Sequence, residues 1–279
     1  IGEPVEVSDL MRISNQDFNN CRRKHLKQRA QLHANFWESL QKYPELIRNE
    51  NGIAILEKVP EDQIDDNKVF FFAFCTRWQV EVFVEYKSIV FLDSTHNTYF
   101  SLEDGNRKAF LYTLLLKHNV AGCGVPVAFM ITNSETQRPL ANWLSWLRQR
   151  LQMPTSIIFM IDCSASEMAA IESAFGDSQI RVCHWHMLRA MRFQLNQKLF
   201  LPTSAGGGSS SVSRRGQNKK LRESVIQDFI NLMNAKIRDE LHHAWNGYCN
   251  NYAEQKNWLC YIESTWMKHS EKWWSGNRA

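Results

Sequence analysis

The spacing of apolar residues divides the chain into a helical start, a middle rich in short apolar runs, and a helical end. From residue 8 to about 51, apolar side chains recur every three or four positions, which predicts an N-terminal helical segment over 1–51. Over 52–199, short apolar runs bounded by turn residues alternate with amphipathic stretches. From 221 to 279 the spacing is helical throughout, which predicts a C-terminal all-helical region.

The middle segment has the pattern of an α/β protein. Consecutive strands followed by alternating strands and helices predict a mixed sheet with helices on both faces. The expected strands are 52–59, 69–75, 88–94, 109–118, 125–132, 156–162 and 179–183. The expected helices are 138–151, 164–175, 186–195, 221–237, 242–255 and 258–274.

The stretch between the sheet and the C-terminal helices has an unusual composition. Residues 203–220 read TSAGGGSSSVSRRGQNKK, so a flexible, basic, Gly/Ser-rich linker is predicted over 200–220, of either natural or engineered origin. The chain is therefore predicted to comprise a helical segment (1–51), a core (52–199), this linker and a helical region (221–279).

Composition narrows the class of protein only modestly. The chain has 279 residues, 44% hydrophobic and 22% charged, as in an ordinary globular protein, and no run is apolar enough to span a membrane. The net charge of +4 permits a nucleic-acid partner without requiring one. Seven scattered cysteines argue for a reducing compartment. The missing initiator Met and signal peptide suggest a piece of a longer protein.

Two aspartates stand where strongly apolar runs stop. Asp93 follows IVFL and Asp162 follows IIFMI, so each is predicted at a strand end. In open α/β sheets ligands bind outside the carboxyl ends of the strands, and paired carboxylates there suit Mg²⁺. The alternative is that each Asp serves only as a turn residue or helix cap.

Other polar residues near these aspartates have ordinary structural explanations. Glu167 lies three residues after Ser164, which predicts a capping box, and Glu172 is expected to face solvent. Cys183 and His186 have the spacing of half a zinc site. The candidate partners for such a site are His242, His243 and Cys249. A hydrogen-bonded histidine beside the aspartates is the other interpretation.

The order of these motifs resembles the Mutator-like (MULE) transposase domain, including its domesticated relatives in SWIM-type zinc-finger proteins. The resemblance rests on LDSTHNTY, MIDCSASEMAAI and VCHWHMLRAM, in this order, and covers roughly residues 70–195. It implies that the predicted mixed sheet has an RNase H-like fold. It also implies that the C-terminal helices are an insertion into that fold.

The resemblance also implies a site. Its catalytic set is Asp, Asp and Glu (DDE) with two Mg²⁺ or Mn²⁺ ions, and Asp93 and Asp162 match the first two positions. Cys183 and His186 match a Cys-x-x-His motif of unproven role. The third carboxylate is expected after the Trp-rich segment KWWSGNRA, with which the chain ends, so we expect this chain to lack it. Glu263 precedes that segment and is a poor candidate.

Two functions follow from the resemblance. One is Mg²⁺-dependent cleavage and transfer of DNA strands by a transposase-type domain, incomplete in this chain. The other is a domesticated, non-catalytic module that binds DNA or protein in transcriptional regulation. Both imply a nuclear location, and either form could be a homo-oligomer. An unrelated Mg²⁺-dependent nuclease on the same fold is disfavoured by the Cys-x-Trp-His sequence and the helical insertion.

Overall fold

A computed structural model describes most of the chain. The described residues are 32–59, 69–85, 89–99, 109–117, 122–154, 156–176, 178–199 and 211–277, with only the backbone described at 96–99, 211–215 and 217. Two compact units result: the first combines residues up to 85 with 94–113 and 126–139, and the second combines 86–93, 114–125 and 140–279. The predicted helical pattern over residues 8–31 lies outside the described residues.

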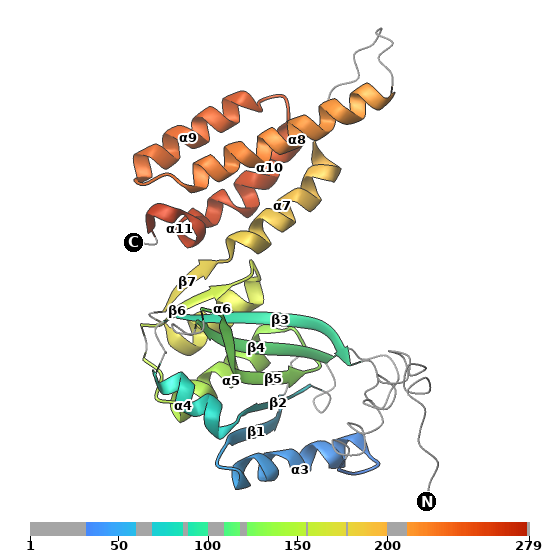
Figure 1. Cartoon of the computed structure of the whole chain (residues 1–279), viewed down its shortest axis with the longest axis vertical. Helices are drawn as coiled ribbons and strands as arrows, with labels where there is room; N and C mark the ends of the chain where they lie inside the picture. The colour runs from blue at the N-terminus through green and yellow to red at the C-terminus, as the bar shows by residue number, and fades with distance from the viewer. Residues whose placement is uncertain are drawn as a thin grey trace, which may run out of the picture. The chain divides into compact units, whose positions relative to one another are not determined.

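The described strands form one seven-stranded mixed sheet in the order β1-β2-β5-β4-β3-β6-β7 (Figure 1). β1 pairs antiparallel with β2, and β2 with β5, whereas β6 runs parallel to both β3 and β7. The predicted α/β fold with a mixed sheet is thereby confirmed. The strands are β1 (Ile53–Lys58), β2 (Phe70–Cys75), β3 (Ile89–Tyr99), β4 (Ala109–Lys117), β5 (Gly124–Thr132), β6 (Ile158–Ile161) and β7 (Gln179–Val182).

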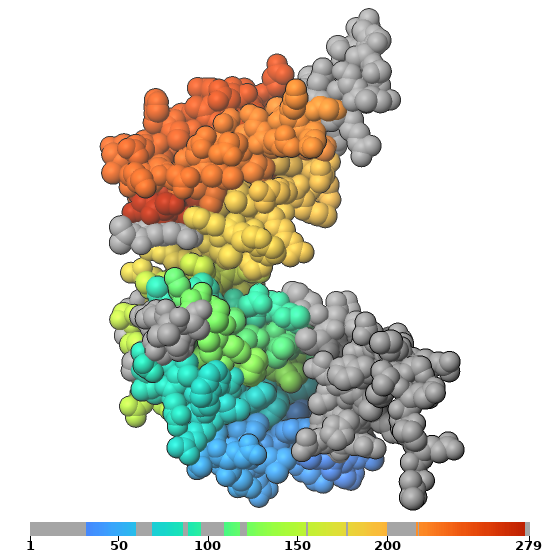
Figure 2. All heavy atoms as spheres, viewed as in Figure 1, coloured from blue at the N-terminus to red at the C-terminus, as the bar shows by residue number. Residues whose placement is uncertain are grey.

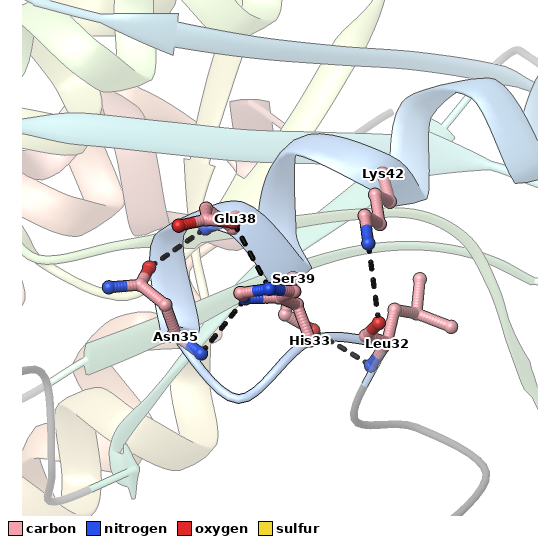
Figure 3. Close-up of polar contacts among 6 residues, drawn as sticks. All are labelled: Leu32, His33, Asn35, Glu38, Ser39 and Lys42. Carbon is pink, nitrogen blue, oxygen red and sulfur yellow. Dashed lines mark hydrogen bonds and ion pairs between the residues drawn. The ribbon is translucent and has the colours of Figure 1, made fainter.

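Helix α3 (Phe36–Asn49) packs on β1 and β2 in the first unit. The side chain of Asn35 accepts a hydrogen bond from the Glu38 N–H at 3.0 Å and so caps the helix, while Ser39 Oγ accepts from Leu32 N–H (Figure 3). Buried Leu40, Phe70 and Phe72 form a small core between the helix and the strands. This packing accounts for the confirmed part of the predicted N-terminal helical segment.

Helix α4 (Arg77–Glu85) is absent from the sequence prediction. At its start, Gln79 Oε1 accepts hydrogen bonds from the Thr76 N–H at 2.8 Å and from the Thr76 hydroxyl at 3.1 Å, as the third helical residue of a capping box reaches back to the residue before the helix. Gln79 is 4% exposed, and its amide nitrogen donates to the Pro126 carbonyl at 3.0 Å. The sequence TRWQ contained this signal, but the valines and phenylalanine that follow it are typical of strands.

Cys75, the last residue of β2, is fully buried, and burial raises the pKa of its thiol to about 12. Cys123 is exposed. Because the thiolate is the reactive form, we expect less than about a tenth of Cys75 to be alkylated in the time that Cys123 reacts fully. Mass spectrometry of the native chain measures this, with Cys123→Ser as the control that removes the fast site. Equal labelling of the two thiols would contradict the burial.

Three helices accompany the parallel strands β6 and β7 in the sequence of the second unit. These are α5 (Gln137–Arg150), α6 (Ala165–Phe175) and α7 (His184–Lys198). Phe159 of β6 meets Phe175 of α6 with ring centroids 4.8 Å apart, and Trp143 of α5 is fully buried. Ser164 caps α6 by accepting from the Glu167 N–H, which confirms the part of the predicted capping box that Ser164 supplies.

The C-terminal residues are helical, as predicted. They form α8 (Ser211–Met233), α9 (Arg238–Asn251), α10 (Lys256–Thr265), η1 (Met267–His269), α11 (Ser270–Trp273) and η2 (Ser275–Asn277). The single helix predicted over 258–274 is wrong, because the chain breaks at Trp266, whose carbonyl accepts from the Trp273 indole N–H at 2.8 Å. Most of the C-terminal tryptophans are core residues, with exposed fractions from 0% to 8%: Trp258, Trp266, Trp273 and Trp274.

The predicted flexible linker needs a correction. Helix α8 begins at Ser211, so residues 211–220 are helical, and the low apolar content of this stretch concealed the helix. The rest of the linker, 200–210, lies outside the described residues. The proposed division of the chain into four segments stays a prediction. In the part of the chain that the structure describes, no helix is both long enough and apolar enough to cross a membrane.

Candidate functional site

Asp93 and Asp162 lie side by side on neighbouring parallel strands. In the register of β3 and β6, Phe91 pairs with Met160. Extending that register by two residues brings Asp93 level with Asp162, and residues at the same level of parallel strands face the same side of the sheet. The predicted pairing of the two aspartates therefore follows directly from the sheet.

The predicted position of Asp93 at a strand end is wrong. β3 continues to Tyr99, so Asp93 lies within the strand, whereas Asp162 directly follows the last residue of β6 as predicted. The reason is that β3 has a neighbour on each side: β6 stops at Ile161, but β4 lies along its other edge. The aspartates thus meet where the parallel pairing ends.

A third side chain, His186, completes the group. Helix α7 begins at His184, and the Cys183 N–H before it donates to the Ile161 carbonyl at 2.8 Å, which fixes the helix start beside the end of β6. His186 Nδ1 contacts Asp162 Oδ1. One ligand atom from each of Asp93, Asp162 and His186 lies within 4.8 Å of the other two.

Burial raises the pKa of the Asp162 carboxyl above its ordinary value, and the negative charge of Asp93 raises it further. The contact with His186 and the positive charge of Arg189 act in the opposite direction. Asp162 and His186 remain partly open to solvent, with 35% and 31% of their side chains exposed. A carboxyl group whose pKa is raised by burial and by a second carboxylate, at a solvent-accessible position, is typical of a functional site.

The group opens into a pocket of about 440 Å³. Its walls come from β3, the end of β4 with the turn before β5, the end of β6, and the start of α7, all within the second unit. Lys117 and Cys123 contribute to the wall, and so does Cys183, one turn before His186. The pocket therefore joins a negative group to at least one positive side chain, as a site for a phosphate and its counter-ion would.

The donor set fits a divalent cation. Two carboxylates supply the oxygen ligands that Mg²⁺ requires, and an imidazole nitrogen extends the choice to Mn²⁺ and other transition metals. Among the described residues, this is the only group of three or more acidic, His or Cys side chains with ligand atoms close enough to share an ion. The arrangement is thus compatible with the predicted Mg²⁺ or Mn²⁺.

Neither nearby glutamate supplies a third carboxylate to this group. Glu167 is 2% exposed on α6, and Glu263 lies on α10. Both lie outside the described group of ligands. Glu263 instead lies near Cys249, whose thiol pKa is raised by burial and further by that carboxylate. The expectation that Glu263 is a poor candidate agrees with this placement.

The described residues provide no further ligand for a zinc site at Cys183 and His186. His242, His243 and Cys249 are on α9, and within the described part of the chain they form no ligand group with Cys183. His186 instead contacts Asp162, which is the alternative that the sequence left open. The sequence left open which aspartate the histidine meets, because the position of α7 after β7 decides this.

The sheet and its flanking helices define an RNase H-like domain. The comparison with protein families is more specific: residues 51–181 match the model described as zinc finger SWIM domain-containing protein 1/3, RNaseH-like domain. The matched segment runs from just before β1 into β7 and includes Asp93 and Asp162. This supports the predicted likeness to SWIM-type proteins, whereas the likeness to MULE transposases stays a prediction. A search of the curated proteins found no match.

Proposed function

We propose that this RNase H-like domain binds a divalent cation, Mg²⁺ or Mn²⁺, through Asp93 and Asp162, and uses the site to hold a phosphate of DNA. The observation that carries the proposal is the group of Asp93, Asp162 and His186, with ligand atoms within 4.8 Å. In the active form of this function, the domain cleaves and transfers DNA strands as a transposase-type enzyme in the nucleus. A further carboxylate from outside the described residues completes its acidic set.

Each residue has a distinct role in this proposal. Asp93 and Asp162 supply negative oxygen ligands, and a bound cation stabilises charge that develops on phosphate oxygens. His186, in contact with Asp162 Oδ1, orients that carboxylate. Lys117, on the pocket wall, offers a positive charge to the phosphate. All four side chains to which the proposal gives a role belong to the second unit.

The proposal predicts that the wild-type chain binds Mn²⁺ at one site or at a pair of adjacent sites. Two carboxylates at one position usually give a weak but measurable site, which substrate phosphates strengthen. Calorimetric titration with Mn²⁺ and Mg²⁺, without DNA and then with a short duplex, measures this. We expect tighter cation binding in the presence of DNA. The absence of heat from either cation, with and without DNA, would contradict the proposal.

The second candidate is a non-catalytic module that binds DNA or protein in transcriptional regulation. It is favoured by one observation: among the described residues no third carboxylate joins Asp93 and Asp162. Incubation of labelled duplex and single-stranded DNA with the chain and Mn²⁺ separates the two candidates. Cleavage products that disappear in Asp162→Asn support the enzyme, and DNA binding without cleavage supports the module.

A further inference from the structure

Helix α7 carries a row of exposed aromatic and basic side chains directly after the candidate site. Trp185 is 60% exposed and Phe193 is 63% exposed, although both are large apolar residues. Arg189 lies between them at four-residue spacing, so the three side chains share one face of the helix. Part of the surface of α7, in yellow, is uncovered on the face shown in Figure 2.

The charged side chains of α7 itself are all basic. Helix α7 reads HWHMLRAMRFQLNQK, which contains Arg189, Arg192 and Lys198 but no Asp or Glu. Arg189 and Arg192 are both exposed. An apolar face that docks onto another protein is usually depleted in charge at its centre. Here each exposed aromatic has an arginine beside it, which is the combination used to bind single-stranded nucleic acid.

The row is continuous with the candidate site. Trp185 precedes His186, and their rings meet edge to face with centroids 4.6 Å apart. The Arg189 guanidinium lies over the Trp185 ring at 5.2 Å from its centroid. Arg189 also favours the charged form of Asp162. A strand held on α7 would therefore pass next to the carboxylates.

We propose that Trp185, Arg189, Arg192 and Phe193 form a platform that binds an unpaired DNA strand, by base stacking on the aromatics and phosphate contacts from the arginines. Trp185 and Phe193 are separated by about 12 Å along the helix, or eight residues at 1.5 Å each. At about 3.4 Å per stacked nucleotide, this spans roughly three to four nucleotides. The inference rests on the proposed function, because it supplies the strand whose phosphate enters the pocket.

The test measures binding of a short fluorescein-labelled oligodeoxynucleotide of mixed sequence by fluorescence anisotropy, in EDTA so that no cation takes part. We expect Trp185→Ala and Phe193→Ala each to weaken binding about fivefold or more. Trp185→Phe should retain most of the affinity. The matched control is Trp78→Ala, because Trp78 is 55% exposed on α4, a helix of the first unit, and is not part of the row on α7. Any binding elsewhere on the chain is common to the variants and the control.

The two arginines are tested separately, through the salt dependence of binding. Arg189→Gln and Arg192→Gln should each reduce the slope of log affinity against log salt by about 0.7, the value for one lost phosphate contact on a single strand. A photo-crosslinking oligonucleotide should attach to α7, as mapped by mass spectrometry. Aromatic variants that bind as tightly as the Trp78→Ala control would overturn the proposal. Crosslinks confined to other segments would do the same.

The outcomes also separate this inference from the proposed function. Asp93→Asn should not weaken single-strand binding in EDTA, because no cation is held there and the substitution removes a negative charge from beside the strand. A chain that binds no Mn²⁺ but loses single-strand affinity on Trp185→Ala would refute the cation site and support the platform. If α7 is instead an interface between two copies, light scattering would show a wild-type dimer that Phe193→Ala dissociates, and the platform would be wrong.

Discussion

Replacement of Asp93 or of Asp162 by Asn is expected to weaken Mn²⁺ binding at least about 30-fold. Each replacement keeps the shape of the side chain and removes one negative charge from the group with His186. Even in bulk water, a dication and a unit charge 4 Å apart attract by about 2 kcal/mol, and the partly buried position of Asp162 strengthens this. Calorimetric titration of the two variants beside the wild type measures the loss.

The matched control for this experiment is Glu172→Gln. Glu172 is also a carboxylate of the second unit, with 58% of its side chain exposed, but it pairs with Lys272 at 3.3 Å and lies outside the ligand group. Its replacement removes the same charge and should leave Mn²⁺ affinity within about twofold, since screened surface charges contribute little. If the Asp and Glu variants lose affinity equally, the cation is held by the general charge of the chain and not by this site.

The two aspartates could be found from the sequence because of what precedes them. A buried parallel strand reads as a continuous apolar run, and two such runs that each lead into an Asp indicate a pair of carboxylates, although a single Asp there can be a turn residue or a helix cap. The pattern did not reveal that β3 continues beyond Asp93. Residues 94–99, STHNTY, lack an apolar run, and β4 alone lies beside this part of β3, so the strand is set by tertiary pairing.

His186 has one of the two positions that the sequence allowed. Its spacing from Cys183 permitted half a zinc site, because Cys-x-x-His pairs are common zinc ligands, and the other interpretation was a hydrogen-bonded histidine beside the aspartates. The same spacing arises when a residue before a helix and a residue in its first turn lie close together. In the structure Cys183 precedes α7 and His186 contacts Asp162. That contact depends on β6 and β7 being neighbours, which no local pattern encodes.

The helices differ in how far their sequences reveal them. α5 and α6 have long amphipathic or alanine-rich patterns and were placed within a residue or two of their bounds. α4 was missed because Val80, Val82, Phe83 and Val84 favour strands, and packing of buried Val82 and Phe83 outweighs this preference. Local preference is a weak guide wherever tertiary burial decides the conformation.

Trp273→Ala is expected to destabilise the second unit by about 3–5 kcal/mol, the usual cost of removing a buried aromatic ring. Trp273 is fully buried in α11, its indole N–H donates to the Trp266 carbonyl at 2.8 Å, and its ring lies 5.4 Å from that of Phe229. The substitution leaves a cavity and removes one of the two hydrogen bonds to the Trp266 carbonyl, which keeps that from the His269 N–H at 3.0 Å. Urea unfolding followed by far-UV circular dichroism measures the shift in midpoint.

The same tryptophan connects the C-terminal helices to the candidate site. Its carbonyl oxygen lies 2.6 Å from His184 Nε2, and a guanidinium N–H of Arg181 donates to the Glu271 carbonyl at 2.8 Å. These contacts hold α11 against the segment that begins α7, two residues before His186. Trp185→Ala is the control, because that ring is 60% exposed and its loss should change stability by no more than about 0.5 kcal/mol. If Trp273→Ala unfolds at the same urea concentration as Trp185→Ala, the C-terminal helices do not pack as described. If it does destabilise the unit, the start of α7, and with it His186, depends on residues far along the chain from both aspartates.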